Sequence, residues 1–115
     1  MIIKIKNLRL ETILGIYDWE QNVKRPIIIN AEIHTGFDNA RFSNDISKTI
    51  DYDIIVKQIK TYVASKNFQL VEKMAQEIIE NIMTDKRIDK CSLEIDKVGA
   101  VENLESFSIT LTEER

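Results

Sequence analysis

Cysteine, proline and glycine are scarce in this 115-residue chain, and each scarcity excludes a class of protein. A single cysteine, Cys91, cannot form a disulfide within the chain, and with the one histidine, His34, it cannot build a Cys/His zinc site. One proline and three glycines leave no linker and no low-complexity stretch. We therefore expect a single domain over residues 1–115.

Long apolar runs and an excess of positive charge are missing as well. No purely aliphatic run is longer than residues 27–29, and residues 1–15 carry charges throughout, so neither a membrane span nor a signal peptide is expected. Sixteen basic and nineteen acidic side chains give a net charge of −3, which argues against nucleic acid or an anionic membrane as a partner. We expect a cytoplasmic protein with no metal or other cofactor, whose chemistry rests on Lys, Tyr, Glu and Asp.

Four segments alternate apolar and polar residues with the period of a β-strand. The first changes its apolar face partway, which predicts a β-bulge near Asn7. Pro26 opens the second, which is long for a domain of this size. The four strands are expected over residues 2–14, 27–37, 91–96 and 106–112.

Two segments between the second and third strands have helical periodicity. Asp51 or Asp53 can cap a helix whose apolar side falls within residues 54–63. Apolar pairs then recur every four residues over residues 70–83, which predicts an amphipathic helix. The order strand, strand, helix, helix, strand, strand predicts an α+β fold, a four-stranded antiparallel sheet with both helices on one face.

The edges of this expected sheet need partners. Long edge strands are normally blunted, covered or paired with another chain, and the second face of the sheet is left bare. The simplest solution is a closed ring in which the sheet of one subunit continues into the next. We therefore expect a homo-oligomer.

Polar residues interrupt these patterns at the ends of the expected elements. Glu20 closes a loop that also holds Tyr17 and Trp19, Tyr52 precedes the first helix, Glu72 starts the second, and Lys97 ends the third strand. Each of them, taken singly, also fits a structural role: an acid in a first helical turn, for example, is favoured by the helix dipole. Cys91 lies in register with Leu93 and Ile95, and we expect a buried thiol that is not a nucleophile.

Taken together and in order, these segments resemble the dihydroneopterin aldolase family, folate-pathway enzymes with the tunnelling fold. The resemblance covers nearly the whole chain. Val98 departs from it, because a proline usually follows the lysine, and so does Asn44, where aspartate is common; neither change removes a functional group. The matching segments are GIYDWE at 15–20, Arg25-Pro26, SNDI at 43–46, TIDY at 49–52, FQLVE at 68–72 and KVGA at 97–100.

The resemblance implies an assembly and a reaction. Four protomers would join their sheets into a barrel with the helices outside, two such rings would stack into an octamer, and active sites would lie at subunit interfaces. The substrate would be the pterin 7,8-dihydroneopterin. Retro-aldol cleavage of its side chain, by general acid/base chemistry without a Schiff base or a metal, would give 6-hydroxymethyl-7,8-dihydropterin and glycolaldehyde.

The same resemblance implies a role for each candidate residue. Glu72 would anchor the pterin, with Leu70 and Val71 lining the pocket. Lys97 would be the general acid/base. Tyr52, supplied by the neighbouring subunit, would lie against the pterin and share the proton transfers, and Glu20 would position the hydroxyls of the tail or a water molecule.

Three alternatives remain open at this point. An epimerase of the same fold would use the same acid/base residues on a phosphorylated dihydroneopterin, and extra Lys or Arg near the tail would favour it; the sequence has no dedicated basic cluster beside Glu20 or Lys97. A ring that binds a pterin or purine without turnover is the second. A structural oligomer whose polar residues coincide by chance is the third.

Overall fold

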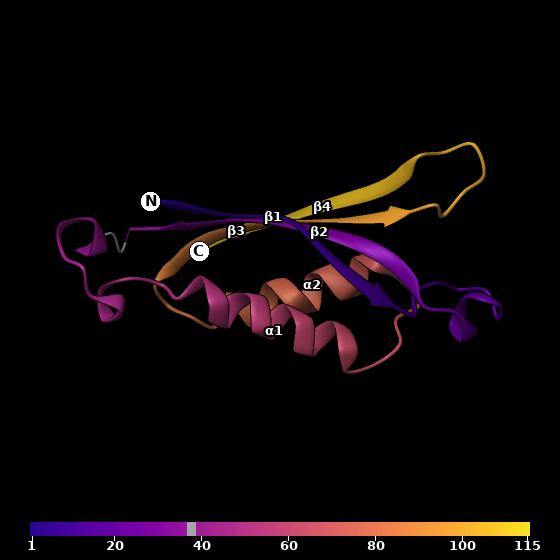
Figure 1. Ribbon diagram of the computed structural model, residues 1–115, viewed down its shortest axis with the longest axis horizontal. Helices are drawn as coiled ribbons and strands as arrows, with labels where there is room; N and C mark the ends of the chain where they lie inside the picture. Colours follow the sequence, from indigo (N-terminus) through magenta and orange to yellow (C-terminus); the bar gives the residue numbers. More distant parts are fainter. Residues whose placement is uncertain (37–38) are drawn as a thin grey trace.

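The computed structural model describes residues 1–36 and 39–115, and its elements follow the predicted order (Figure 1). The four strands form one antiparallel sheet in the order β1-β2-β3-β4, and both helices cover the same face of it (Figure 1). The predicted α+β fold is confirmed. The strands are β1 (Ile2–Thr12), β2 (Arg25–Thr35), β3 (Ile88–Val98) and β4 (Ser106–Glu114); the helices are α1 (Tyr52–Ala64) and α2 (Val71–Ile82).

The predicted bulge in β1 is confirmed at its predicted position. The pairing of β1 with β2 shifts register between Ile5 and Leu8, and Asn7 has a φ of 55°. The backbone N–H of Asn7 donates to Oδ1 of Asn30 at 2.8 Å, so a side chain of β2 replaces the lost ladder bond. The bulge moves the apolar face of the strand from odd to even positions, which keeps both halves of β1 against the core.

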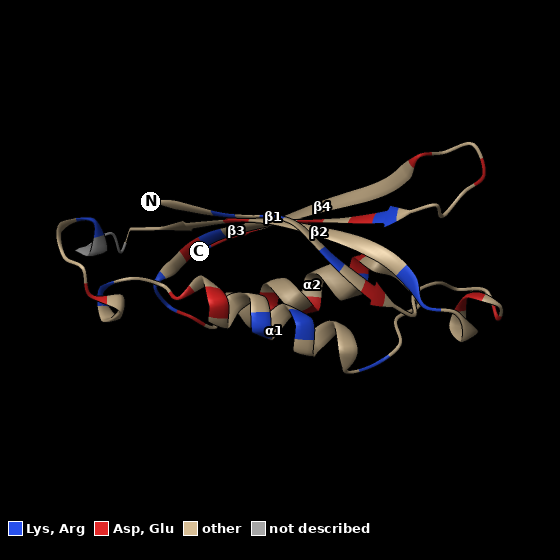
Figure 2. Ribbon diagram, in the orientation of Figure 1, with Lys and Arg blue, Asp and Glu red and all other residues tan. Residues whose placement is uncertain are grey.

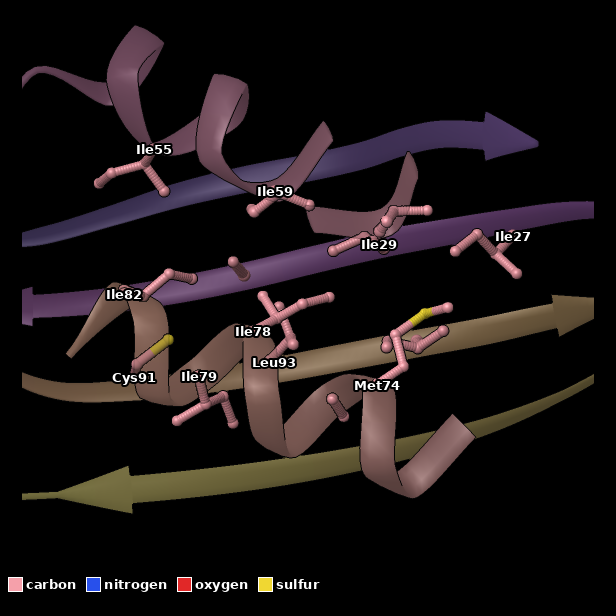
Figure 3. Packing of buried hydrophobic residues seen from close by; sticks show 14 of the residues in the cluster. Ile27, Ile29, Ile55, Ile59, Met74, Ile78, Ile79, Ile82, Cys91 and Leu93 are labelled. Atoms are coloured by element: carbon pink, nitrogen blue, oxygen red, sulfur yellow. The ribbon is translucent and has the colours of Figure 1, made fainter. Parts of the chain in front are cut away.

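The hydrophobic core lies between the sheet and the two helices (Figure 3). Alternate residues of the two central strands point toward the helices, and α1 and α2 contribute residues three and four positions apart. The edge strands β1 and β4 contribute only partly buried side chains, because the helices lie over the middle of the sheet. The core residues labelled in Figure 3 are Ile27, Ile29, Ile55, Ile59, Met74, Ile78, Ile79, Ile82, Cys91 and Leu93.

Both helices begin close to where the sequence predicts. Asp51 is the N-cap of α1, and its side chain accepts a hydrogen bond from the backbone N–H of Asp53 at 3.0 Å. Leu70 is the N-cap of α2 and makes no side-chain cap; Glu72 stands in the first turn, where the helix dipole favours an acid. The predicted second strand extended to Phe37, which lies outside the described residues.

The connections gather at two ends of the subunit. The site end, at the right of Figure 1, is formed by residues 15–24, 65–70 and 98–105. The far end, at the left, is formed by residues 39–51 and 83–87. Short 3₁₀ helices lie at each: η1 (Glu20–Asn22) at the site end, η2 (Asn39–Phe42) and η3 (Ile46–Lys48) at the far end.

Acidic and basic residues are interspersed along the sheet and the helices (Figure 2). This mixed surface agrees with the small net charge of −3. Of the helices in residues 1–36 and 39–115, none is long and apolar enough to cross a membrane.

Candidate active site

Lys97 ends the row of inward-facing residues on β3. Alternation along the strand places Leu93, Ile95 and Lys97 on the face that the helices cover, and Lys97 is the last residue of β3 paired with β2, opposite Ile27. Its side chain is only 15% exposed. Because the same face of β3 buries Leu93 and Ile95, the side chain of Lys97, which follows on that face, is mostly buried as well.

Glu20 meets this lysine from the site-end loop. It is the first residue of η1 and is 6% exposed. Its Oε2 accepts a hydrogen bond from Nζ of Lys97 at 3.0 Å, and its Oε1 accepts one from the backbone N–H of Tyr17 at 3.3 Å. A nearly buried carboxylate with these two donors is held in one position.

The loop that carries Glu20 is built around this carboxylate. Gly15 has a φ of +149°, and a Cβ at this position would overlap the carboxylate of Glu20. The side-chain amide of Gln21 donates to the carbonyl oxygens of both Gly15 and Phe68, and the backbone N–H of Gly15 donates to Phe68 at 3.0 Å. Gln21 thereby fastens the loop of Glu20 to the segment that leads into α2.

The surroundings of Glu20 hold its carboxyl group ionised. Burial opposes ionisation, but the hydrogen bond from Lys97, the backbone N–H of Tyr17 and the positive charges of Lys97 and Arg25 outweigh it and hold the pKa of Glu20 below its usual value. The site therefore contains a buried carboxylate–ammonium pair.

This ion pair borders a hollow of about 280 Å³. Leu70, Val71 and Glu72 line the same hollow from the start of α2, so the structure brings five of the six predicted site residues together. Its wall includes half-exposed apolar side chains such as Leu70, at 50%, which is typical of a site that another surface completes. The remaining lining residues are Gly15, Ile16, Tyr17, Gln69, Ala100, Val101 and Phe107.

Tyr52 is the predicted site residue that does not lie in this hollow. It is the first residue of α1, next to the far end of the subunit, and it is 66% exposed (Figure 1). Within one subunit, Tyr52 is therefore separated from Glu20 and Lys97 by the length of α1.

A larger hollow, of about 360 Å³, lies on the bare face of the sheet and is lined by Lys4, Lys6, Asn30 and Glu94 among others. Asn30 there donates to Glu94 at 3.4 Å. We assign the candidate site to the smaller hollow because it contains the buried Glu20–Lys97 pair, whereas the larger one lies over exposed and half-exposed polar side chains.

Sequence reasoning assigned no role to three residues that shape this site. Gly15 makes room for the carboxylate of Glu20, Gln21 fastens the loop, and Arg25 adds positive charge beside it. Gly15 and Arg25 lie in the segments that carry the family resemblance, which was the signal available for them. Gln21 bonds only to main-chain carbonyls, and such contacts leave no pattern in a sequence.

Comparisons with known proteins identify the family and the fold of the chain. The family model "FolB: Dihydroneopterin aldolase" matches residues 3–112. The chain is 38% identical to the dihydroneopterin triphosphate 2'-epimerase of Escherichia coli strain K12, over 99% of this chain and 95% of that one. It is 28% identical to the dihydroneopterin aldolase of the same strain, over 87% and 82%.

A solved structure has the same architecture. The crystal structure of E. coli dihydroneopterin aldolase in complex with neopterin superimposes with a TM-score of 0.93 at 25% identity, covering 98% of both chains. Sequence and fold therefore agree along almost the whole length, and the chain belongs to the dihydroneopterin aldolase family.

Proposed function

We propose that the hollow is the active site of an enzyme that cleaves the side chain of 7,8-dihydroneopterin, releasing 6-hydroxymethyl-7,8-dihydropterin and glycolaldehyde. The observation that carries this proposal is the buried Glu20–Lys97 pair beside a hollow that Glu72 also lines. Buried titratable groups paired in a concave site are candidates for acid/base chemistry. The family membership supports the choice of a pterin substrate.

Glu72 is the proposed anchor for the pterin ring. A pterin presents an exocyclic amine and a ring N–H as parallel donors, and a carboxylate accepts both in a strong, directional fork. Glu72 stands in the first turn of α2, and Leu70 and Val71 line the hollow beside it. A ring held there lies in the same hollow as Lys97, within which its side chain can reach the ion pair.

Lys97, Tyr52 and Glu20 are the proposed catalytic groups, with Lys97 as the general acid/base and Tyr52 sharing the proton transfers. A base removes the proton of the 2'-hydroxyl, the C1'–C2' bond breaks, and C2' becomes the aldehyde carbon of glycolaldehyde. The electron pair of the broken bond moves into the protonated C=N of the dihydropterin ring, and an acid then protonates C1'. Because the ring is itself the electron sink, Lys97 is required as an acid/base and not as a Schiff-base amine.

Tyr52 enters the site in this proposal from a second copy of the chain. Among the described residues, no strand pairs with the outer side of β1 or of β4. Pairing these edges between copies would close a ring of four protomers, and two such rings would stack into an octamer. Each 115-residue chain would act as a single domain in that ring. Light scattering tests this assembly: a tetramer or larger is expected, and a stable monomer at micromolar concentration contradicts it.

A second candidate function is 2'-epimerisation of dihydroneopterin triphosphate. The observation that favours it is the higher identity to the E. coli epimerase, 38% against 28% for the aldolase. The chemistry is closely related, because an enzyme that retains the cleaved aldehyde and rejoins it on its opposite face inverts C2'. Against it, Lys97 is the only Lys or Arg among the described residues that line the hollow, and it is already paired with Glu20.

One assay distinguishes these functions. Purified protein is incubated with 7,8-dihydroneopterin and, separately, with its triphosphate, while glycolaldehyde and the 2'-epimer are quantified. Glycolaldehyde release from the unphosphorylated substrate is expected. Epimer without glycolaldehyde, mainly from the triphosphate, would assign the epimerase instead.

Two further outcomes of the same assay would reject catalysis. Tight pterin binding without turnover would indicate a binding ring, and neither binding nor turnover would indicate a structural oligomer. Lys97→Ala protein serves as the blank, because it retains Glu72 but lacks the proposed acid/base.

A further inference from the structure

Arg25 connects the two loops that carry Glu20 and Lys97. Its Nη1 donates to the carbonyl oxygen of Gly99 at 3.2 Å, and its guanidinium carbon lies 5.1 Å from the ring centroid of Trp19. Trp19 directly precedes Glu20, and Gly99 follows Lys97 by two residues. The side chain of Arg25 therefore makes a second link between the segments that the Glu20–Lys97 bond joins.

The hydrogen bond from Arg25 to Gly99 lies just beyond the last backbone pair between β2 and β3. The pairing of β2 with β3 ends at Ile27 opposite Lys97, and the next residue of β2 is Pro26, which has no N–H to donate. Continued by two residues, the same register would place Arg25 opposite Gly99. Gly99 lies beyond the last residue pair of β2 with β3, and there the guanidinium of Arg25 donates to its carbonyl oxygen.

The guanidinium holds this position although it leaves one donor unused. Among the described residues, Nε of Arg25 is buried and has no hydrogen-bond partner. An unsatisfied buried donor is destabilising, so the contacts with Trp19 and Gly99 must outweigh that loss. Tyr17 stacks with Trp19 at 6.4 Å between ring centroids, with 4° between the ring planes, which steadies the surface on which Arg25 rests.

We propose that Arg25 is a positioning residue that straps the turn after Lys97 to the Trp19–Glu20 loop and so holds the acid/base pair in register. Its effect on turnover rests on the proposed function, but the strap itself is a property of the free protein. The positive charge of Arg25 also contributes to the lowered pKa of Glu20, which agrees with this placement.

Two substitutions separate the strap from the charge. Arg25→Gln removes the charge, the contact with Trp19 and the hydrogen bond to Gly99 together, whereas Arg25→Lys keeps the charge and loses the planar group that lies over Trp19. Lys60→Gln, on the exposed surface of α1, is the matched control for loss of one positive charge.

In the assay of the proposed function, Arg25→Gln is expected to lower kcat about tenfold with little change in KM, because displaced acid/base groups affect the reaction more than pterin binding. The acidic limb of its pH–rate profile should also move to higher pH, because the ionised form of Glu20 loses the neighbouring positive charge of Arg25. Arg25→Lys should lower kcat but keep the acid limb in place. A merely structural contact would not move the limb.

The decisive measurement needs no turnover. Trp19 is the only tryptophan, so quenching of the intrinsic fluorescence by acrylamide reports on the ring under Arg25. Quenching should increase in both Arg25 variants and stay unchanged in Lys60→Gln, and the pKa of Glu20, followed by NMR in labelled protein, should rise in Arg25→Gln. If Arg25→Gln does not fold, Trp19→Leu removes the other half of the strap and should raise the same pKa less.

Wild-type quenching in both Arg25 variants would overturn the strap whatever the pKa of Glu20, because loss of the charge alone also raises that pKa. Inactive wild-type protein would instead reject the proposed function, and the quenching and NMR results would still decide the role of Arg25.

Discussion

The two ends of the subunit carry different parts of the proposed chemistry. The site end has a buried ion pair, Glu20 with Lys97, whose partners are fixed at 3.0 Å, and a carboxylate, Glu72, beside the same hollow. The far end has Tyr52, which is 66% exposed and is not among the residues that line the hollow there. The site end is thus organised within one chain, whereas the far end presents Tyr52 to solvent.

Both ends also expose large apolar side chains, which an isolated subunit gains nothing from exposing. In the proposed ring, each end would be covered by another copy of the chain. The tyrosine of one copy would then complete the hollow of the next. The exposed apolar residues include Ile16, Tyr17, Trp19, Val23, Leu70, Val101 and Leu104 at the site end, with Phe107 at the adjoining start of β4, and Phe42, Ile46, Tyr52 and Ile54 toward the far end.

The largest effect is expected when the site end loses its lysine. Lys97→Ala should lower the turnover number by about 10²–10⁴-fold, the usual contribution of a general acid/base. Pterin affinity should change much less, because the anchor is Glu72. Initial rates of glycolaldehyde release and calorimetric titration with pterin measure the two quantities separately.

Lys60→Ala, on the exposed surface of α1, is the matched control and should behave as the parent protein does. If Lys97→Ala turns over within a few-fold of the parent, the lysine is not the acid/base, and Tyr52 with water must transfer the protons. A fall in affinity with normal turnover at saturation would assign Lys97 a binding role only.

A mixing experiment tests whether the two ends act together. Tyr52→Ala and Lys97→Ala subunits, each nearly inactive alone, are co-expressed in equal amounts. If every site takes Lys97 from one subunit and Tyr52 from its neighbour, about a quarter of the sites in random mixed rings contain both native residues. Activity should recover to that fraction.

Recovery is impossible if both residues act within one subunit, since no subunit in the mixture has both. Mixing the two proteins after separate purification, without exchange of subunits, is the control and should stay inactive. Absence of recovery in verified mixed oligomers would place Tyr52 outside the site.

A smaller effect is expected at the anchor. Glu72→Gln replaces one acceptor oxygen with a donor that confronts the N–H of the pterin, and loss of a charged hydrogen-bond partner should weaken binding by about 1.5–3 kcal/mol. Glu80→Gln, eight residues further along α2 and exposed, is the control. Unchanged pterin affinity in calorimetry would leave Glu72 as an acid that only stabilises the start of the helix.

Most of the fold could be predicted from the sequence, because the core follows the periods of its elements. Alternation in β2 and four-residue recurrence in α2 correspond directly to buried faces. The ends of the strands could be predicted less accurately. The strand β3 extends from Ile88 to Val98, beyond the residues that alternate, because backbone hydrogen bonds pair residues whatever their side chains. The 3₁₀ helix η1 was missed for a similar reason, since its bonds are all local to the main chain.

The candidate site was predictable to a lesser degree. Glu20 and Lys97 are 77 positions apart, and only the family resemblance placed them together; composition and periodicity give no such contact. The separation of Tyr52 from the hollow was also expected from the resemblance alone. Gln21 could not be assigned, because it bonds only to backbone carbonyls, and a carbonyl is present at every residue.

The smallest expected effect concerns a second clamp of the site end. Glu77 on α2 accepts a 2.6 Å hydrogen bond from the hydroxyl of Tyr62 on α1 and pairs with Lys66 at 3.0 Å, while Nζ of Lys66 lies 5.1 Å from the centre of the Phe68 ring. The connection between the helices, which leads into Leu70, is therefore held by this cluster.

The hydrogen bond from Tyr62, followed by the contacts with Lys66, lowers the pKa of Glu77 from 4.5 to about 2. Since the folded pKa lies below the unfolded one, the cluster stabilises the protein fully above about pH 5, and this stabilisation is lost as the pH falls toward about 2. The free energy of unfolding in urea should therefore be lower for Glu77→Gln than for wild type at neutral pH. This difference should shrink on acidification.

Tyr62→Phe supplies the control, because it removes the same hydrogen bond from the other side. The coupling between the two substitutions should be present at neutral pH and weaken in acid. Amide exchange separates the ends: Glu77→Gln should speed exchange in residues 65–70 and leave residues 46–51 unchanged. A stability difference that stays constant down to about pH 2 would mean that the charge of Glu77 does not hold the site end, which would then depend on the Glu20–Lys97 pair, Gln21 and Arg25.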